Sequence, residues 1–397
     1  MTGVRVSAGA MCLTAVALAC MLMGASGPGF AADAELRVSA SAPAPRVNRA
    51  TWECTAGHEI RRQDITLGSG ERTYAIRLQG CWDESHGDQH PCNEGTFGMP
   101  VPTRANWYAA GFMKILVNGV NATLYQDKLP RVLETGDRGV VQFQWEHPAA
   151  QVGLRLMMLP GGNHLMADLQ WHPREGQTVD SVALALTCYP SFFTSAHNRT
   201  GDRRVMTPRT EEREGNALEL VPAEDTWLYY YDTVFDVASG EGDGPCAVLL
   251  PPESVMGGRV SIGGYAVATS VTLDPASGHT RLGFYDFTGL TNAEAGAYME
   301  EHGAGDLAQL TETSFRPQPV RELDLAAFTA ETNRLLEAAA EDGDRLRPKV
   351  EELIAGVAEL KPRADAGEWD AEADLAEMLQ TSSDLFWKLK TFEVLNM

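Results

Sequence analysis

The sequence has little positive charge and, after its first 31 residues, no long hydrophobic run. Its 54 acidic residues outnumber its 32 lysines and arginines, which gives a formal net charge of −22. An acidic surface repels the phosphates of nucleic acids, so the composition argues against DNA or RNA as a partner. No later segment approaches the roughly 20 apolar residues that span a bilayer, so we expect no stable membrane insertion once those 31 residues are removed.

Several short motifs of well-known enzyme classes are also missing. The sequence contains no nucleophile elbow, phosphate-binding loop, dinucleotide fingerprint or His-Glu-x-x-His motif. Their absence removes the usual signatures of α/β-hydrolases, P-loop proteins, NAD enzymes and many zinc proteases. Whether the chain is an enzyme at all therefore has to be judged from location, fold and side-chain chemistry.

The first 31 residues have the three parts of an export signal. Arg5 is the only charged residue among them, and an apolar stretch over Ala8–Met23 follows it. Glycine and proline then interrupt the stretch, and Gly29–Ala31 places small residues at the −3 and −1 positions of a cleavage site. This pattern predicts a signal peptide over residues 1–31 and a secreted or periplasmic protein. The alternatives are an uncleaved membrane anchor and a lipoprotein.

Cysteine is scarce, and its placement favours disulfides. Removal of the signal leaves five of the seven cysteines, and 31 basic against 54 acidic residues, a net charge of −23. In an oxidising compartment we expect up to two disulfides, and Cys81–Cys92 is the simplest pair because it closes a short loop rich in turn residues. His86 and His90 in that loop make a zinc site the alternative, although the spacing is not that of a zinc finger. Cys54 can compete for either partner, so the connectivity stays open.

Hydrophobic residues alternate with polar or small ones from about residue 52 to residue 287. The clearest alternating or apolar runs are 74–78, 141–145, 154–158, 167–171, 182–188, 227–231, 247–250, 267–273 and 282–287. Turn-forming residues separate them, as expected for half-buried antiparallel strands. Strands and helices do not alternate, so a parallel doubly wound sheet is disfavoured. We predict a mostly β fold, a large supersandwich-like antiparallel β-sandwich over residues 51–320.

The sequence changes to helical periodicity after this region. Residues 291–312 predict a helix that Thr291 or Asn292 caps, with Glu294 in its first turn. Pro317 then follows as a break.

A helical region is expected from there to the carboxyl terminus. Three amphipathic segments follow Asp324, with breaks near Gly343 and Gly367. We predict a helical region over residues 321–397, either a small bundle or helices docked on the sandwich. Residues 32–50, rich in alanine, serine and proline, are expected to form a linker.

The densest polar segment runs from His197 to Arg204, with Arg209 beyond it. Four arginines lie within eleven residues of so acidic a chain. Forked guanidinium donors bind carboxylates, sulfates and sugar hydroxyls. We therefore predict that Arg203 and Arg204 bind substrate and that His197 is a catalytic candidate. The alternative is that these arginines neutralise neighbouring surface acids.

Two further segments carry candidate residues. His164 follows the glycine-rich turn Pro160–Asn163, where backbone can approach a ligand, and histidine exchanges protons near neutral pH. In Trp227–Asp232 alternate aromatics make a stacking platform for sugar rings, with Tyr230 and Asp232 on one face. We predict His164 and Asp232 as catalytic residues and Tyr230 as a substrate-binding residue. The alternatives are an exposed histidine beside an ordinary turn, and tyrosines that belong to the core.

No cofactor or metal is expected from the sequence. The acidic, glycine-rich segment 241–245 offers oxygen ligands that suit Ca²⁺. It lacks the repeating spacing of a calcium loop, so we interpret it as a turn.

We expect the partner to be a glycan or another extracellular polymer. This expectation follows from the predicted export of the protein, its large sandwich, its aromatic strands and its clustered arginines. In outline the architecture is similar to the large sandwich of galactose mutarotases and polysaccharide lyases. That resemblance implies a galactose mutarotase-like fold and transfers no residue roles, because the motifs around the mutarotase histidine pair are not found. We hypothesise an exported carbohydrate-active or carbohydrate-binding protein, as an enzyme a glycan hydrolase, lyase or epimerase. The alternative is a non-catalytic structural or protein-interaction module of the cell envelope.

Overall fold

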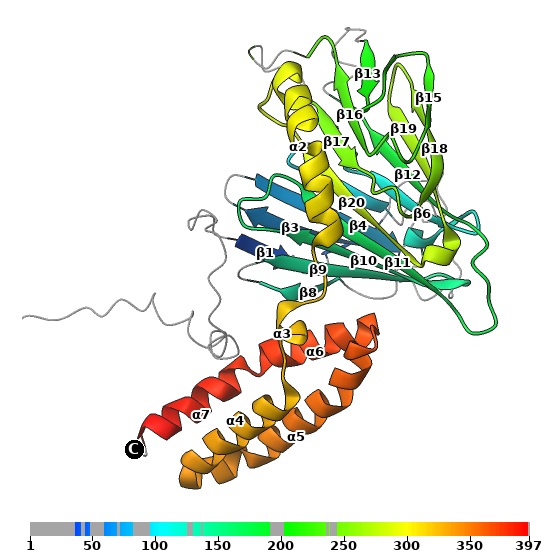
Figure 1. Cartoon of the computed structure of the whole chain (residues 1–397). Coiled ribbons are helices and arrows are strands. Elements are labelled where there is room, and N and C mark those ends of the chain that lie inside the picture. The colour runs from blue at the N-terminus through cyan, green and yellow to red at the C-terminus, as the bar shows by residue number, and fades with distance from the viewer. Residues whose placement is uncertain are drawn as a thin grey trace, which may run out of the picture. The chain divides into compact units, whose positions relative to one another are not determined.

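The computed structural model separates into two compact units, a β unit that ends at Phe315 and a helical unit that begins at Arg316. It describes residues 36–40, 44–47, 59–69, 72–81, 96–124, 130–135, 138–190, 202–235, 238 and 244–395. Three antiparallel sheets are followed by carboxyl-terminal helices (Figure 1). The expectation of a mostly β sandwich with a helical carboxyl-terminal segment is confirmed.

The largest sheet has nine strands and forms one layer of the sandwich. Its order is β14 (Glu211–Arg213), β13 (Arg203–Met206), β16 (Trp227–Asp232), β17 (Cys246–Leu249), β20 (His279–Asp286), β11 (Leu165–Pro173), β10 (Ala150–Met158), β9 (Gly139–Glu146) and β8 (Arg131–Glu134). Alternation along these strands sends one set of side chains toward the other layer. In β11, for example, Leu165, Leu169 and Trp171 belong to the core between the layers.

Two smaller sheets face the nine-stranded sheet. The six-stranded sheet has the order β15 (Ala217–Leu220), β18 (Val255–Ile262), β19 (Val267–Leu273), β12 (Val182–Cys188), β6 (Met113–Val117) and β7 (Val120–Asn121). The five-stranded sheet contains β1 (Leu36–Ala40), β3 (Glu59–Ser69), β4 (Arg72–Cys81) and β5 (Thr96–Val101), with β2 (Ala44–Val47) also paired to β3. Side chains of all three sheets share one hydrophobic core.

Two strands, β1 and β2, lie within the segment 32–50 that was expected to be a linker. β1 pairs with β3 from Leu36 opposite Ser69 onward, and β2 pairs with β3 from Val47 opposite Glu59. The composition of this segment gives little indication of strands. A sheet edge offers main-chain hydrogen bonds to any extended segment, so pairing here does not require strand-favouring side chains.

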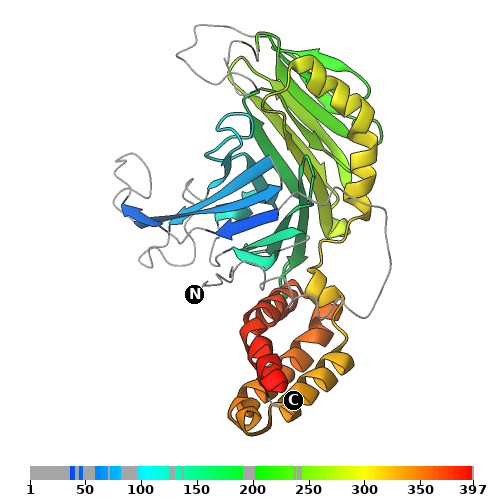
Figure 2. The same ribbon diagram turned by 90° about the vertical axis from the view of Figure 1, so that its left-hand side faces the viewer.

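The helix α2 (Asn292–Glu312) lies on the outer face of the nine-stranded sheet, against β16 and β20 (Figures 1 and 2). Its predicted start is confirmed, because Thr291 accepts a hydrogen bond from the amide of Glu294 and Glu294 bonds back in a capping box. At Gly303 the helix packs closely against Trp227 of β16. A methyl group there would lie 2.8 Å from Cδ1 of Trp227. The helix thus removes much of this sheet face from solvent.

The helical unit contains five helices in the described chain. They are α3 (Gln318–Arg321), α4 (Leu325–Ala338), α5 (Ala340–Asp365), α6 (Trp369–Thr381) and α7 (Ser383–Leu395). The expected third amphipathic segment is thus two helices, separated at Ser382. The break expected at Gly343 is absent, because Gly343 lies inside α5. A side chain at position 343 would place its Cβ 2.3 Å from the Leu336 carbonyl oxygen, so glycine at this position allows α4 and α5 to approach each other. Among the described helices, none is both long enough and apolar enough to cross a bilayer.

The close contact of α2 with Trp227 predicts opposite effects for two glycines of the same helix. Alanine is a better helix former than glycine, so Gly305→Ala, which faces open space, should raise the free energy of unfolding by about 0.5–1 kcal/mol. Gly303→Ala should lower it by about 1–3 kcal/mol, because the methyl group meets the buried indole. Urea unfolding followed by tryptophan fluorescence measures both. Equal stabilisation by the two substitutions would contradict the described docking of α2.

Candidate functional site

One end of the sandwich carries three tyrosines beside an arginine and a glutamate. We call Tyr108, Tyr189, Tyr265, Arg203 and Glu214 the rim cluster. The Tyr108 and Tyr189 rings lie 5.0 Å apart, and the Tyr189 and Tyr265 rings 5.2 Å apart, both edge to face. The side chain of Tyr265 is 66% exposed, whereas Tyr189 is buried. The cluster therefore presents one aromatic ring to solvent on a buried aromatic support.

Strand pairing in both layers brings the rim cluster together. In the six-stranded sheet Cys188 lies opposite Val267, so the residue after β12 meets the turn that precedes β19. From the nine-stranded sheet, Arg203 donates a hydrogen bond from Nη1 to the carbonyl oxygen of Gly264 in that turn. Its guanidinium also lies 3.7 Å from the carboxylate of Glu214. The rim cluster thus joins the two layers.

The rim cluster has the chemistry to hold a polyhydroxylated ring. An aromatic face packs against apolar C–H surface, and a carboxylate accepts hydrogen bonds from hydroxyl groups. Burial, and next the neighbouring Tyr265 and Tyr108, raise the pKa of Tyr189 to about 12, so its hydroxyl stays protonated at neutral pH. Sequence reasoning missed Tyr265. Its only local sign is an aromatic residue after two glycines in a turn between strands.

Two predicted site residues lie beside the rim cluster but inside the sandwich. Asp232 is opposite Arg203 in the pairing of β13 with β16 and is fully buried. Burial raises the pKa of Asp232, although the hydrogen bond from the Val234 amide and the charge of Arg203 oppose this. Tyr230 is also buried, and its hydroxyl is 2.9 Å from Oγ1 of Thr269. Tyr230 and Asp232 share one face of β16, as expected, and that face points into the interior of the sandwich.

Two other described arginines of this region, Arg204 and Arg209, pair with nearby acids. Arg204, on the opposite side of β13, lies 2.9 Å from Asp202 and 3.3 Å from Glu211. Arg209 lies 2.9 Å from the buried carboxylate of Asp225. These contacts match the alternative expectation that the arginines neutralise neighbouring carboxylates.

One of the two histidines predicted to be catalytic, His164, lies beneath α2. The His164 ring is buried, and its centroid is 4.9 Å from that of Tyr285. The hydroxyl groups of Tyr285 and Tyr298 both donate to Asp306 of α2, over 2.6 and 3.0 Å. Burial lowers the pKa of His164 to about 4, with Asp306 acting in the opposite direction. The imidazole is therefore neutral at physiological pH and covered by the helix.

The structure does not bring His164 and Asp232, the two predicted catalytic residues that it describes, to one surface. His164 faces outward from the nine-stranded sheet, because its neighbour Leu165 belongs to the core. Asp232 faces inward between the layers, beside Arg203. An acid–base pair across one substrate would require the two side chains on the same face of the sheet.

Some of the expected residues lie outside the described part of the chain. These are His197, most of the acidic segment 241–245, Cys92, and the side chain of Cys81, whose backbone ends β4. The Cys81–Cys92 disulfide stays a prediction. Within the described residues, no group of three or more histidines, cysteines and acidic residues is placed to hold a metal ion.

A polar row, buried except for the half-buried Arg281, crosses the outer face of the nine-stranded sheet. Gln142, Arg155, Asp168 and Arg281 lie side by side in register on four strands. Nε of Arg155 donates to Gln142 over 2.9 Å, and the guanidinium of Arg281 lies 5.4 Å from the Phe315 ring. Burial raises the pKa of Asp168, and Arg281 and Arg155 oppose it. We interpret the row as support for the segment that follows α2.

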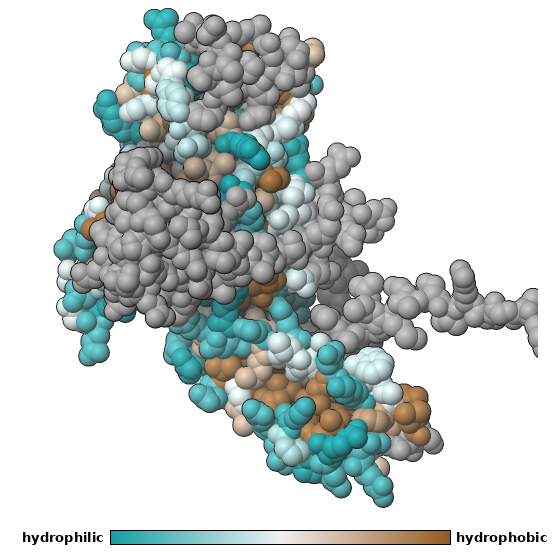
Figure 3. Space-filling model, turned by 180° about the vertical axis from the view of Figure 1, so that it is seen from behind, coloured by the Kyte–Doolittle hydropathy of each residue, from teal (hydrophilic) through white to brown (hydrophobic). Residues whose placement is uncertain are grey.

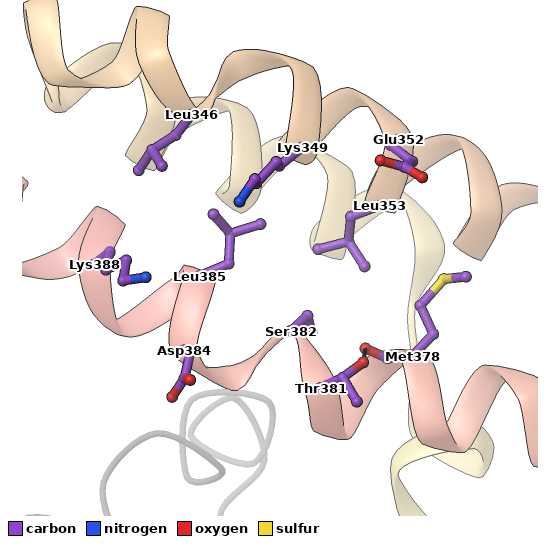
Figure 4. A pocket seen from close by; sticks show the side chains of 10 residues that line it. All are labelled: Leu346, Lys349, Glu352, Leu353, Met378, Thr381, Ser382, Asp384, Leu385 and Lys388. Carbon is purple, nitrogen blue, oxygen red and sulfur yellow. Dashed lines mark hydrogen bonds between the residues drawn. The ribbon is translucent and has the colours of Figure 1, made fainter.

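The helical unit carries a groove of about 360 Å³ between α5 and the pair α6–α7 (Figure 4). Lys349 and Lys388 project from facing helices beside an apolar floor. Hydrophobic side chains also gather on the face of this unit that Figure 3 shows. The lining residues are Leu346, Lys349, Glu352, Leu353, Met378, Thr381, Ser382, Asp384, Leu385 and Lys388.

Changing His164 should alter the acid stability of the protein. Its pKa in the folded protein, about 4, is below the ordinary 6.5. Below pH 6.5 the unfolded protein takes up a proton on His164 that the folded protein does not. The free energy of unfolding therefore falls by roughly 2–3 kcal/mol between pH 6.5 and pH 4. His164→Phe, which keeps an aromatic ring against Tyr285, should show a smaller loss of unfolding free energy over this range.

The control for that measurement is the exposed His279, changed to phenylalanine in the same way. Denaturant unfolding at a series of pH values gives the comparison. If both variants follow the wild-type pH profile, the imidazole of His164 is not held in a buried, neutral state.

Comparison with known proteins assigns no family to this chain. No family model matches it, and no curated protein does. Among solved structures, it is similar to the GH36 α-galactosidase AgaB from Geobacillus stearothermophilus, with 11% identity and a TM-score of 0.31 over 57% of this chain and 40% of that one. A TPR-domain-containing protein from Parabacteroides distasonis has 11% identity and a TM-score of 0.34 over 93% and 80% of the two chains. The chain spans two fifths of that α-galactosidase, and such scores assign no function.

Proposed function

We propose that the β unit is an exported, non-catalytic glycan-binding module whose binding surface is the rim cluster. The observation that carries this proposal is the exposed ring of Tyr265, supported edge to face by Tyr189. In this proposal a sugar ring packs its apolar face on Tyr265, and hydroxyl groups donate to Glu214, whose side chain is 28% exposed.

Arg203 acts in this proposal as a positioning residue. Its guanidinium is mostly buried and donates to the Gly264 carbonyl oxygen, directly before Tyr265. It also lies near Glu214. One side chain therefore holds both the turn that carries the ring and the carboxylate. Such preorganisation reduces the conformational entropy that is lost on binding.

The separation of the acidic and basic candidates favours binding over catalysis. Glycoside hydrolysis commonly uses two carboxyl groups that flank the scissile bond. Asp232 is closed off between the layers, and His164 is covered by α2 on the opposite sheet face. The predicted signal peptide supports a ligand that lies outside the cytoplasm, such as a glycan or another polymer.

The rim cluster predicts how a single substitution affects glycan binding. Tyr265→Ala should weaken binding of the glycans that a glycan array identifies by about 5–50-fold, because it removes the stacking ring. Tyr265→Phe should retain most of the affinity. Met256→Ala, which removes another exposed apolar side chain on β18, is the matched control and should have no effect.

Product analysis of the bound glycans separates the two classes of function. The proposal expects recovered glycans to be chemically unchanged. Cleaved or epimerised products would make the protein an enzyme, and unaltered binding by Tyr265→Ala would reject the rim cluster as the binding surface.

A second candidate function belongs to the helical unit. We infer that its groove binds an acidic amphipathic helix of a protein partner, in line with an interaction module of the envelope. Leu346 and Leu353 are seven residues apart on α5, about 10 Å or two helical turns, which matches the apolar stripe of a docked helix. Within the described residues, neither Lys349 nor Lys388 forms an ion pair, so both can meet acidic side chains.

Reversing the charge of the two groove lysines should reverse which of two oppositely charged peptides the groove binds more tightly. The probe is a labelled 14-residue synthetic helix with leucines at i, i+4 and i+7 and flanking glutamates, and its counterpart carries lysines instead. The full-length double variant Lys349→Glu/Lys388→Glu should bind the glutamate peptide about tenfold more weakly and the lysine peptide more tightly. Lys390 is on α7, as Lys388 is, but does not line the groove. The Lys390→Glu variant should therefore bind as the wild type does. Equal binding of both peptides by the wild type would exclude this function.

A further inference from the structure

Two buried cysteines come from opposite layers of the sandwich. Cys188 ends β12 of the six-stranded sheet, and Cys246 begins β17 of the nine-stranded sheet. Their side chains are 1% and 0% exposed, and both belong to the shared core. Both are free thiols in this structure.

The two cysteines contact the same short segment of the chain. Sγ of Cys246 lies 3.7 Å from the carbonyl oxygen of Asn106. After burial, the neighbouring Cys188 thiol is the next cause that raises the pKa of the Cys246 thiol. The next residue, Trp107, pairs with Cys188 through an isolated antiparallel bridge. The backbone of Cys188 and the thiol of Cys246 therefore both contact the segment Asn106–Trp107, which brings the two cysteines together from opposite layers.

We propose that Cys188 and Cys246 form a disulfide bond that joins the two layers. A disulfide requires two cysteines whose backbones lie close together, and the shared contact of this pair with Asn106–Trp107 places both in the same part of the core. The pair also fits the predicted extracytoplasmic location, where disulfides persist. Together with the predicted Cys81–Cys92 bond it uses four of the five mature cysteines and leaves Cys54 as the remaining thiol.

The bond forms by exchange with an external disulfide, such as an oxidoreductase of the export compartment or oxidised glutathione. The thiolate of one cysteine attacks the oxidant, forming a mixed disulfide and releasing one reduced thiol. The second thiolate then attacks the mixed disulfide, closing the Cys188–Cys246 bond and releasing the second thiol. The two cysteines lose two electrons to the oxidant, and their two protons end on its thiols.

Oxidation belongs to the folding process rather than to the finished fold. In the closed sandwich neither sulfur is accessible to an oxidant. Burial also raises the pKa of the Cys246 thiol, which keeps it protonated. The bond is therefore expected to form after export, before the layers close over the two sulfur atoms.

Peptide mapping of the full-length protein tests the bond directly. The protein is exported through its own leader, denatured with iodoacetamide but no reductant, digested and analysed by mass spectrometry. The expected result is a linked pair of peptides containing Cys188 and Cys246 that disappears after reduction. Complete alkylation of both cysteines without reduction, or linkage of either one to Cys54, overturns the proposal.

Thermal unfolding with and without reductant measures the effect of the same bond. Linking two cysteines that are 58 positions apart in the sequence should raise Tm by roughly 5–10 °C. The Cys81→Ala/Cys92→Ala variant isolates this bond and should keep a reductant-sensitive Tm of that size. Adding Cys188→Ala/Cys246→Ala to it should remove the sensitivity. Equal reductant sensitivity in both variants also overturns the proposal, whatever the glycan-binding results are.

Discussion

The burial of Trp107 between the layers is the contact on which the arrangement of the β unit depends. Its ring meets Tyr230 and Phe284 of the nine-stranded sheet edge to face, and its Nε1 donates to the Tyr285 carbonyl oxygen over 2.7 Å. Its backbone pairs with Cys188 of the six-stranded sheet. Facing sheets are aligned by the side chains that interdigitate between them, so this residue helps to set the register of the two layers. The rim cluster and the Cys188–Cys246 pair both depend on that alignment.

The outer face of the nine-stranded sheet explains where a ligand is not expected. Trp227, Tyr229 and Tyr285 face α2, and the polar row from Gln142 to Arg281 continues beside it. Burying aromatic surface contributes about 1.5–3 kcal/mol for each large side chain, so the helix is held firmly in place. This part of the sheet face is therefore a helix–sheet interface. Solvent-exposed aromatic and charged chemistry is found together at the rim, where strands of two sheets end.

Much of the fold was predictable because its signals are local. Period-two alternation indicated the strands, and Thr291 and Glu294 indicated the start of α2, since strands and helix caps are defined by neighbouring residues. β1 and β2 were not predictable in this way. They exist through main-chain pairing with β3, which their side chains do not encode.

The candidate site was predictable only in part. Alternation by itself determined that Tyr230 and Asp232 share one face of their strand. Tertiary structure decided that this face is the core, and that His164 points away from it beneath α2. Tyr265 acquires a role only through Tyr189, 76 residues earlier in the chain. The physical reason is that a strand's sequence separates its two faces, whereas what packs over each face is supplied by distant parts of the chain.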